Sequence, residues 1–286
     1  MDLVQLIAYV VVLLLLGGAV FVVVGGIRTR GHMERALNMG LFLIQVPKEH
    51  PKDGQPTQQQ QVRELISVGE QLLASLANAH STGWNKFLYG EPYVSLELAV
   101  HHVGEETHMY MAVPRSLNDV IEKQIHSYYP TAEVTKVNDY NIFNPEGASA
   151  GALIRYSKEQ ILPFRTYQKL ESDPLSALLT SLSKLQASGE GAAIQILARP
   201  SHNKKLLELA HKVAREMQSG FNYIDALHRA KHPPKKKKEE EYAAYKEQKV
   251  RAHTVSAAEE EIIKALAEKA GKQNFDVNVR IVTSSA

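Results

Sequence analysis

Cysteine is absent from this 286-residue sequence, and the net charge at neutral pH is only +2. The absence of cysteine excludes disulfides, thiolate metal sites and a cysteine nucleophile, and it agrees with a reducing compartment. A nearly balanced charge does not favour a broadly basic surface for nucleic acid. The phosphate-binding motif G-x-x-x-x-G-K-[ST] is also missing. We therefore expect no ATP hydrolysis by this chain itself.

Charge is missing altogether from Leu3 to Ile27. A membrane-spanning helix needs roughly 20 mostly apolar residues to cross a hydrocarbon core of ~30 Å. A secretory signal would begin with basic residues and carry an apolar core of only about 7–15 residues. A buried soluble helix would show a polar face, and residues 6–24 show none. We predict a transmembrane anchor over residues 1–30, with these side chains in lipid: Leu3, Leu13, Leu16, Phe21 and Ile27.

Basic residues follow the apolar stretch at once. Arg28, Arg30 and Arg35 lie downstream of it, whereas Asp2 lies upstream. Because cytoplasmic flanks of membrane helices are enriched in lysine and arginine, these three arginines set the predicted topology. We expect a single pass through the inner membrane with the remaining chain in the cytoplasm.

Alternation of apolar and polar residues predicts strands in the remaining chain. Helices with a 3.6-residue apolar period separate most of them, such as the helix that opens at Ser256 with Glu259 as a capping box. The predicted strands are 41–46, 93–101, 107–114, 133–137, 152–156, 192–199 and 275–283.

The order of these elements predicts an α+β fold of two ferredoxin-like (split βαβ) units. Residues 41–138 give strand, helix, strand, strand, helix, strand. Residues 151–286 begin the same order again, interrupted by a helical and charged insertion over 201–271. The closing helix and fourth strand of the second unit are missing, so we expect the sequence to be an N-terminal fragment of something longer.

Two glycine-containing segments resemble catalytic motifs. Residues 147–151 match G-x-S-x-G, but a nucleophilic Ser149 would need a strand before it and a helix after it. Here a loop precedes and a strand follows, so we interpret the segment as a flexible linker between two sheets. Gly189-Glu-Gly191 leads into a strand, which indicates a turn.

Histidine and lysine clusters offer weak binding signals. His101 and His102 are neighbours on a strand and point to opposite faces, while His228 and His232 have helical spacing without the carboxylate of H-E-x-x-H. We assign no catalytic, cofactor-binding or metal-ligating residue. The run Lys235, Lys236, Lys237 and Lys238 could contact anionic lipid or nucleic acid, although the adjacent 239–241 glutamates favour a solvated linker.

Several strings of residues resemble one family. They are SLELAV (95–100), MAVPR (111–115), DYNIFNP (139–145), ILPFRTYQKLESDP (161–174) and GEGAAIQILARP (189–200). Together with the anchor they are similar to the N-terminal region of TraG-type conjugative transfer and type IV secretion ATPases, mostly of candidate-phylum bacteria. In that family the region precedes a hexameric RecA-like motor domain.

The resemblance implies a non-catalytic region that anchors a DNA-translocating motor and mediates its assembly. Its partners would be the lipid bilayer and either further copies or secretion-system subunits. Two alternatives stay open, a stand-alone membrane adaptor and a membrane-bound nucleic-acid-binding protein. The net charge does not support the latter. An enzyme built around Ser149 is the least favoured class.

Overall fold

A computed structural model describes most of the chain. The described residues are 3–47, 58–77, 81, 83–103, 106–166, 169, 174–185, 189–201, 203–233 and 255–285.

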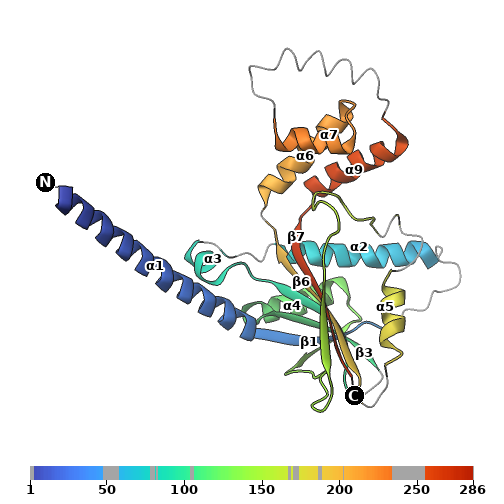
Figure 1. Cartoon of the computed structure of the whole chain (residues 1–286). Coiled ribbons are helices and arrows are strands. Elements are labelled where there is room, and N and C mark those ends of the chain that lie inside the picture. The colour runs from blue at the N-terminus through green and yellow to red at the C-terminus, as the bar shows by residue number, and fades with distance from the viewer. Residues whose placement is uncertain are drawn as a thin grey trace.

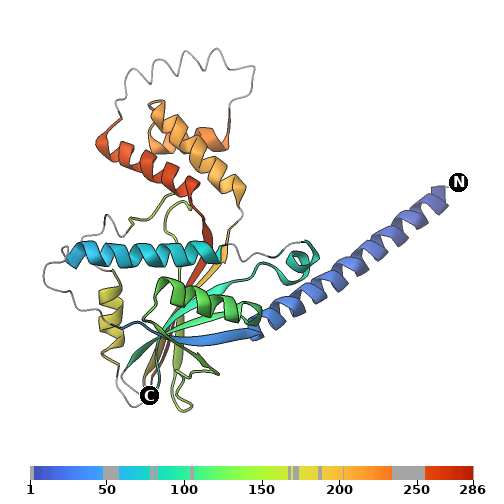
Figure 2. The same ribbon diagram turned by 180° about the vertical axis from the view of Figure 1, so that it is seen from behind.

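The apolar stretch lies within one long helix, α1 (Leu3–Leu37), which projects away from the body of the molecule (Figures 1 and 2). The helix continues well past the predicted anchor boundary at residue 30. A single residue, Asn38, then connects it to strand β1 (Met39–Gln45), and the amide of Asn38 donates to the carbonyl of Glu34 at 2.9 Å. Because the connection is so short, the direction of α1 is tied to the direction of β1.

All seven predicted strands are present, and they form one sheet in the order β4-β1-β3-β2-β6-β7-β5. Every pairing is antiparallel. The strands after β1 are β2 (Val94–Val100), β3 (Thr107–Pro114), β4 (Glu133–Val137), β5 (Ser149–Ile154), β6 (Gly191–Pro200) and β7 (Phe275–Ser284).

The expectation of two separate sheets is wrong. Strand β2 of the first half pairs with β6 of the second half, with Glu97 opposite Gln195. Two separate sheets would each leave a strand edge with unpaired amides and carbonyls at this position. Pairing β2 with β6 gives the amides and carbonyls of both edges hydrogen-bond partners. Local sequence patterns carry no information about such long-range pairing.

Helices cover one face of the sheet. They are α2 (Gln58–Leu76), α4 (Asn118–Tyr128), which follows the short helix η1 (Arg115–Leu117), and α5 (Pro174–Leu182). Phe42 and Ile44 of β1 are buried in a cluster with Leu72 of α2 and Ile121 of α4. Leu182 of α5 packs in a second cluster over β2 and β6. Alternate residues of β1, β2 and β6 therefore direct apolar side chains toward these helices.

Residues 138–148 cross the opposite face of the sheet, and their Ile142 is buried there with Ala99 and Ala193. A Cβ atom at Gly191 would lie 2.1 Å from the carbonyl oxygen of Ile142, so only glycine allows this close approach.

The linker interpretation of 147–151 is wrong in part. Ser149 and Gly151 are in β5, opposite Ser284 and Val282 of β7. Alanine and glycine carry no apolar alternation, so the pattern could not reveal this strand start.

The predicted insertion is a helical subdomain between β6 and β7 (Figure 1). It contains α6 (Lys204–Gln218), α7 (Tyr223–Lys231) and α9 (Ala257–Gly271), which share a separate core with Ile161. The predicted capping box of Ser256 and Glu259 is confirmed at the start of α9. The insertion leaves and re-enters the sheet at neighbouring positions, because Pro200 pairs with Phe275.

Candidate functional site: the junction between the apolar helix and the sheet

The residues predicted to lie in lipid are on α1, and four of their side chains are exposed. Leu13, Leu16 and Phe21 are exposed, and Phe21 reaches 79%. Ile27 is 47% exposed, and Leu3 is the first residue of the helix. Residues 11–37 are long and apolar enough to cross a membrane, and none of the most apolar window is buried. Such exposure of large apolar side chains is costly in water and typical of a surface that contacts lipid.

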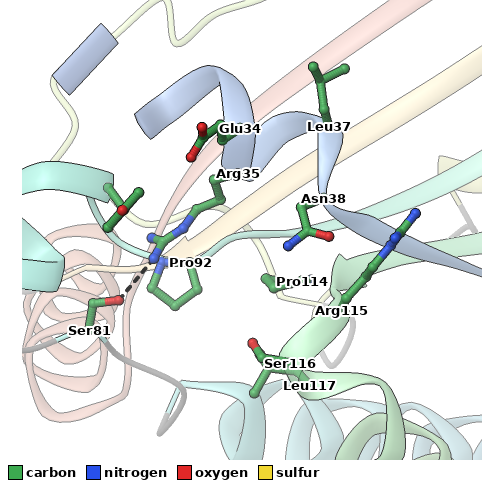
Figure 3. Close-up of a pocket in the computed structure, with 11 residues that line it drawn as sticks. Glu34, Arg35, Leu37, Asn38, Ser81, Pro92, Pro114, Arg115, Ser116 and Leu117 are labelled. Atoms are coloured by element: carbon green, nitrogen blue, oxygen red, sulfur yellow. Dashed lines mark hydrogen bonds between the residues drawn. The ribbon is translucent and has the colours of Figure 1, made fainter. Parts of the chain in front are cut away.

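The three arginines predicted to set topology have different surroundings. Arg28 and Arg30 are exposed, and the Arg28 guanidinium lies 5.3 Å from the centre of the Phe87 ring. Arg35 is half-buried and donates to the carbonyl of Gly90 at 2.5 Å. It also donates to the hydroxyl of Ser81 at 3.2 Å (Figure 3). Arg35 thus holds the end of α1 on the body of the molecule, in addition to any effect on topology.

A short helix that the sequence analysis did not predict, α3 (Gly83–Tyr89), lies beside α1 in both views (Figures 1 and 2). Gly31 is buried at this contact. A Cβ atom there would lie 2.8 Å from the carbonyl oxygen of Leu88 and 2.9 Å from Cδ1 of Tyr89. The absence of a side chain at Gly31 therefore allows the two helices to touch.

A pocket of about 630 Å³ lies where α1 meets the body (Figure 3). Arg35 and Glu34 line it from α1, and Arg115 and Ser116 line it from η1, directly after β3. The Arg115 amide donates to the Asn38 carbonyl at 3.2 Å, which joins the start of η1 to the residue before β1. Guanidinium and hydroxyl groups of this kind can bind and orient a polar group.

A second cluster of polar groups lies on the sheet face opposite the helices. Glu97 is 7% exposed and accepts hydrogen bonds from Ser95 Oγ at 2.6 Å and from the hydroxyl of Tyr140. Burial and the bond to Glu97 raise the pKa of Tyr140 far above its ordinary value. Tyr140 also stacks on Tyr110, with ring centres 4.5 Å apart. The cluster fastens residues 138–148 to the sheet.

His101 extends this cluster, since its Nε2 lies 2.7 Å from the Tyr110 hydroxyl. Burial lowers the pKa of His101, and the neighbouring His108 lowers it further. The ring of His101 is stacked on Tyr140 with centres 5.8 Å apart. Among the described residues, no group of three or more His, Asp or Glu side chains could hold a metal ion.

The remaining sequence motifs have plain structural roles. Ser149 is the first residue of β5 and is followed by strand, so the strand-to-helix turn of a nucleophile elbow is not formed. Gly189 has φ 101° in a turn before β6, as predicted. His228 and His232 are exposed near the end of α7. The run Lys235, Lys236, Lys237 and Lys238 lies outside the described residues.

Sequence reasoning missed two features of the junction, the packing role of Arg35 and the helix α3. A basic residue after an apolar helix has the same pattern whether it faces water or the protein, so the sequence held no signal for Arg35. For α3 a weak signal existed, because Trp84 and Phe87 are spaced three residues apart beside Lys86.

A family model for a domain of unknown function (DUF8128) matches residues 53–286. The chain belongs to the DUF8128 family. No curated protein and no solved structure matches it. The DUF8128 match begins after α1 and β1, although β1 pairs with both β3 and β4 inside the sheet. The structural unit therefore extends upstream of the matched residues.

Proposed function

We propose that this DUF8128 protein is the membrane-tethered, non-catalytic region of a TraG-type DNA-translocating ATPase and serves anchoring and assembly. The observation that carries the proposal is the exposed apolar surface of α1, which is joined to the sheet by one residue and held there by Arg35. The resemblance of residues 95–200 to that family supplies the link to a motor.

The proposed location is the inner membrane, with the sheet and its helices in the cytoplasm. Arg28 and Arg30 support this orientation because both are exposed directly after the apolar segment. Lys86 of α3 lies on the same side of the proposed span, but its ammonium is paired with the Glu91 carboxylate at 2.6 Å, so the two arginines carry this argument.

We further propose that the sheet consists of two split βαβ units. The relative order of strands supports this, since β1, β3 and β2 are neighbours in the first half and β5, β7 and β6 in the second. In each half a helix connects the first two strands, α2 in one and α5 in the other. Strand β4 lies beside β1, and within the described residues β5 has no neighbour in the equivalent position.

The free edge of β5 is the proposed assembly surface, and its occupant is a second copy of this chain. Strand β4, at the other edge, carries Glu133 and Lys136, and charges of this kind oppose edge-to-edge pairing. Strand β5 (SAGALI) has no charge, and Leu153 and Ile154 are 44% and 52% exposed. An uncharged, exposed edge strand is suited to antiparallel pairing with an identical strand.

Flotation with membranes followed by cysteine cross-linking tests both parts of the proposal. Because the chain has no cysteine, Ala150→Cys or Ala152→Cys on β5 gives a single reactive site, and Thr135→Cys on β4 is the matched control. We expect every variant to float with lipid and only the β5 variants to form covalent dimers with a short bismaleimide. Release from membranes at alkaline pH would contradict the anchor. Equal cross-linking from Thr135→Cys would contradict the assembly surface.

Salt-dependent binding of DNA by the full chain in detergent would favour the nucleic-acid-binding alternative, because phosphate contacts release counterions.

A further inference from the structure

Helix α3 presents aromatic side chains to the outside of the molecule. Trp84 is 77% exposed and Phe87 is 43% exposed. The two rings lie three residues apart on one side of the helix, in an edge-to-face contact with centres 5.9 Å apart. Exposure of the only tryptophan in the chain needs an explanation, because a folded protein in water gains by burying such a ring.

The contacts of α3 with α1 run in one order along both segments. Arg28 meets Phe87, Gly31 meets Leu88 and Tyr89, and Arg35 bonds to Gly90 directly after α3. Moving along α3 toward its first residues therefore moves back along α1 toward Ile27. Trp84, which precedes Phe87 by about one turn, lies at the end of α3 closest to the apolar segment.

The depth of α3 follows from helix geometry. Gly31 is four residues past Ile27, which at 1.5 Å per residue is about 6 Å beyond the end of the apolar segment. The polar headgroup layer on each side of a hydrocarbon core is roughly 5–8 Å thick. A bilayer crossed by α1 would therefore bring its headgroups level with α3. Tryptophan is enriched at this depth, where an indole ring is partly in hydrocarbon and its N–H is hydrated.

We propose that α3 is a second membrane contact, with Trp84 and Phe87 inserted at the boundary between headgroups and acyl chains on the same side as the body. This inference rests on the proposed membrane span of α1. The occupant is an anionic phospholipid surface, because the exposed Arg28 and Arg30 lie at this end of the junction. Lys86 lies beside them and is paired with the Glu91 carboxylate at 2.6 Å. Two contact points fix the tilt of α1 and prevent the sheet from turning freely about it.

The fluorescence of Trp84 tests the proposal without a label. The full chain is reconstituted into vesicles of phosphatidylcholine and phosphatidylglycerol, and only vesicles recovered by flotation are measured. We expect a blue-shifted emission, protection from aqueous acrylamide, and quenching that is stronger with bromine at shallow acyl positions than at deep ones. Failure to float would overturn the span of α1. Flotation with an unquenched, acrylamide-accessible Trp84 would overturn the role of α3 alone.

A matched variant controls for nonspecific quenching. In Trp84→Phe combined with Phe164→Trp, the only indole moves to an exposed position beside α9. We expect this indole to remain open to acrylamide and unaffected by brominated lipid. Protection of Trp84 that also occurs in lipid-free detergent, and that depends on protein concentration, would assign the surface to a second copy and overturn the lipid contact.

Discussion

Arg35 links three segments of the chain at the level of single residues. It belongs to α1, and its guanidinium reaches Gly90 after α3 and Ser81 before α3. Hydrogen bonds to a charged donor each stabilise a fold by about 1.5–3 kcal/mol when the donor is partly buried. Arg35 is therefore a better candidate for a structural residue than the exposed Arg30.

Arg35→Ala should loosen the junction and lower the thermal unfolding midpoint of the detergent-solubilised protein. Loss of the Gly90 bond alone, at about 1.5–3 kcal/mol, corresponds to a fall of roughly 3–12 °C for a domain of this size. The matched variant Arg30→Ala removes the same charge from an exposed position and should change the midpoint little. Equal shifts in the two variants would contradict the structural role of Arg35.

The hydrogen bond between Tyr140 and Glu97 affects how the stability of the fold changes at alkaline pH. The fold holds the Tyr140 phenol protonated, and its pKa is raised above the ordinary value of about 10 that applies in the unfolded chain. The folded state therefore binds this proton more tightly than the unfolded state. Its contribution to stability is complete below about pH 10 and is lost as the pH rises further.

Tyr140→Phe should cost about 1–3 kcal/mol at neutral pH, because Glu97 loses a hydrogen bond while it stays buried. The same variant should lose less further stability between about pH 9 and pH 11 than the original protein. Urea unfolding at each pH measures both effects. Ser95→Ala removes the other hydrogen bond to Glu97. Its stability should fall with rising pH as steeply as that of the original protein. If Tyr140→Phe loses as much stability between about pH 9 and pH 11 as the original protein, the raised pKa of Tyr140 does not explain the alkaline loss.

Strand β1 belongs to the sheet but lies outside the residues that the family model matches. It lies between β4 and β3, and its Phe42 and Ile44 are 2% and 6% exposed in the core. A protein that begins at residue 53 should lack cooperative unfolding, since removal of one buried phenylalanine side chain alone costs about 3–5 kcal/mol. A protein that begins at residue 38 keeps β1 and should unfold cooperatively. Circular dichroism during heating distinguishes them, and cooperative unfolding of the shorter protein would contradict the role of β1.

The helical insertion is the element that should be removable. Ser201 donates its amide to the carbonyl of Asn274 at 2.8 Å, so the two positions are already joined as in a hairpin. Replacing residues 202–273 by Asn-Gly supplies a two-residue turn of the type that such a hairpin favours. Ile161→Ser is added because Ile161 packs in the insertion core. We expect the strand signal in circular dichroism and cooperative unfolding to persist, and their loss would show that the sheet depends on the insertion.

Local patterns predicted the elements better than their assembly. Strand β7 alternates strongly over residues 275–283, and the Ser256 capping box is a short-range signal, so both were predicted correctly. The pairing of β2 with β6 joins residues that are about a hundred positions apart, and no local pattern encodes it. The start of β5 at Ser149 was hidden by small residues. Helix α3 is only 7 residues long and too short for a clear apolar period.

At the scale of the whole molecule, exposed apolar surface is distributed unequally between α1 and the body. The longest continuous exposed apolar surface is on α1, which projects from a body that has several apolar cores of its own. The junction at Arg35 and Gly31 joins the two parts firmly enough to transmit an orientation. A span through the membrane would use this connection to hold the sheet at a fixed side of the bilayer.

Labelling of single cysteines in sealed cells tests this claim most directly, because the native chain has no cysteine. Asp2→Cys and Thr135→Cys mark the two ends of the proposed topology, and a membrane-impermeant maleimide reports which is accessible from outside. We predict labelling of Asp2→Cys in intact spheroplasts and labelling of Thr135→Cys only after the membrane is permeabilised. Labelling of Thr135→Cys from outside, or of both positions from the same side, would contradict a helix that crosses the bilayer and holds the sheet in the cytoplasm.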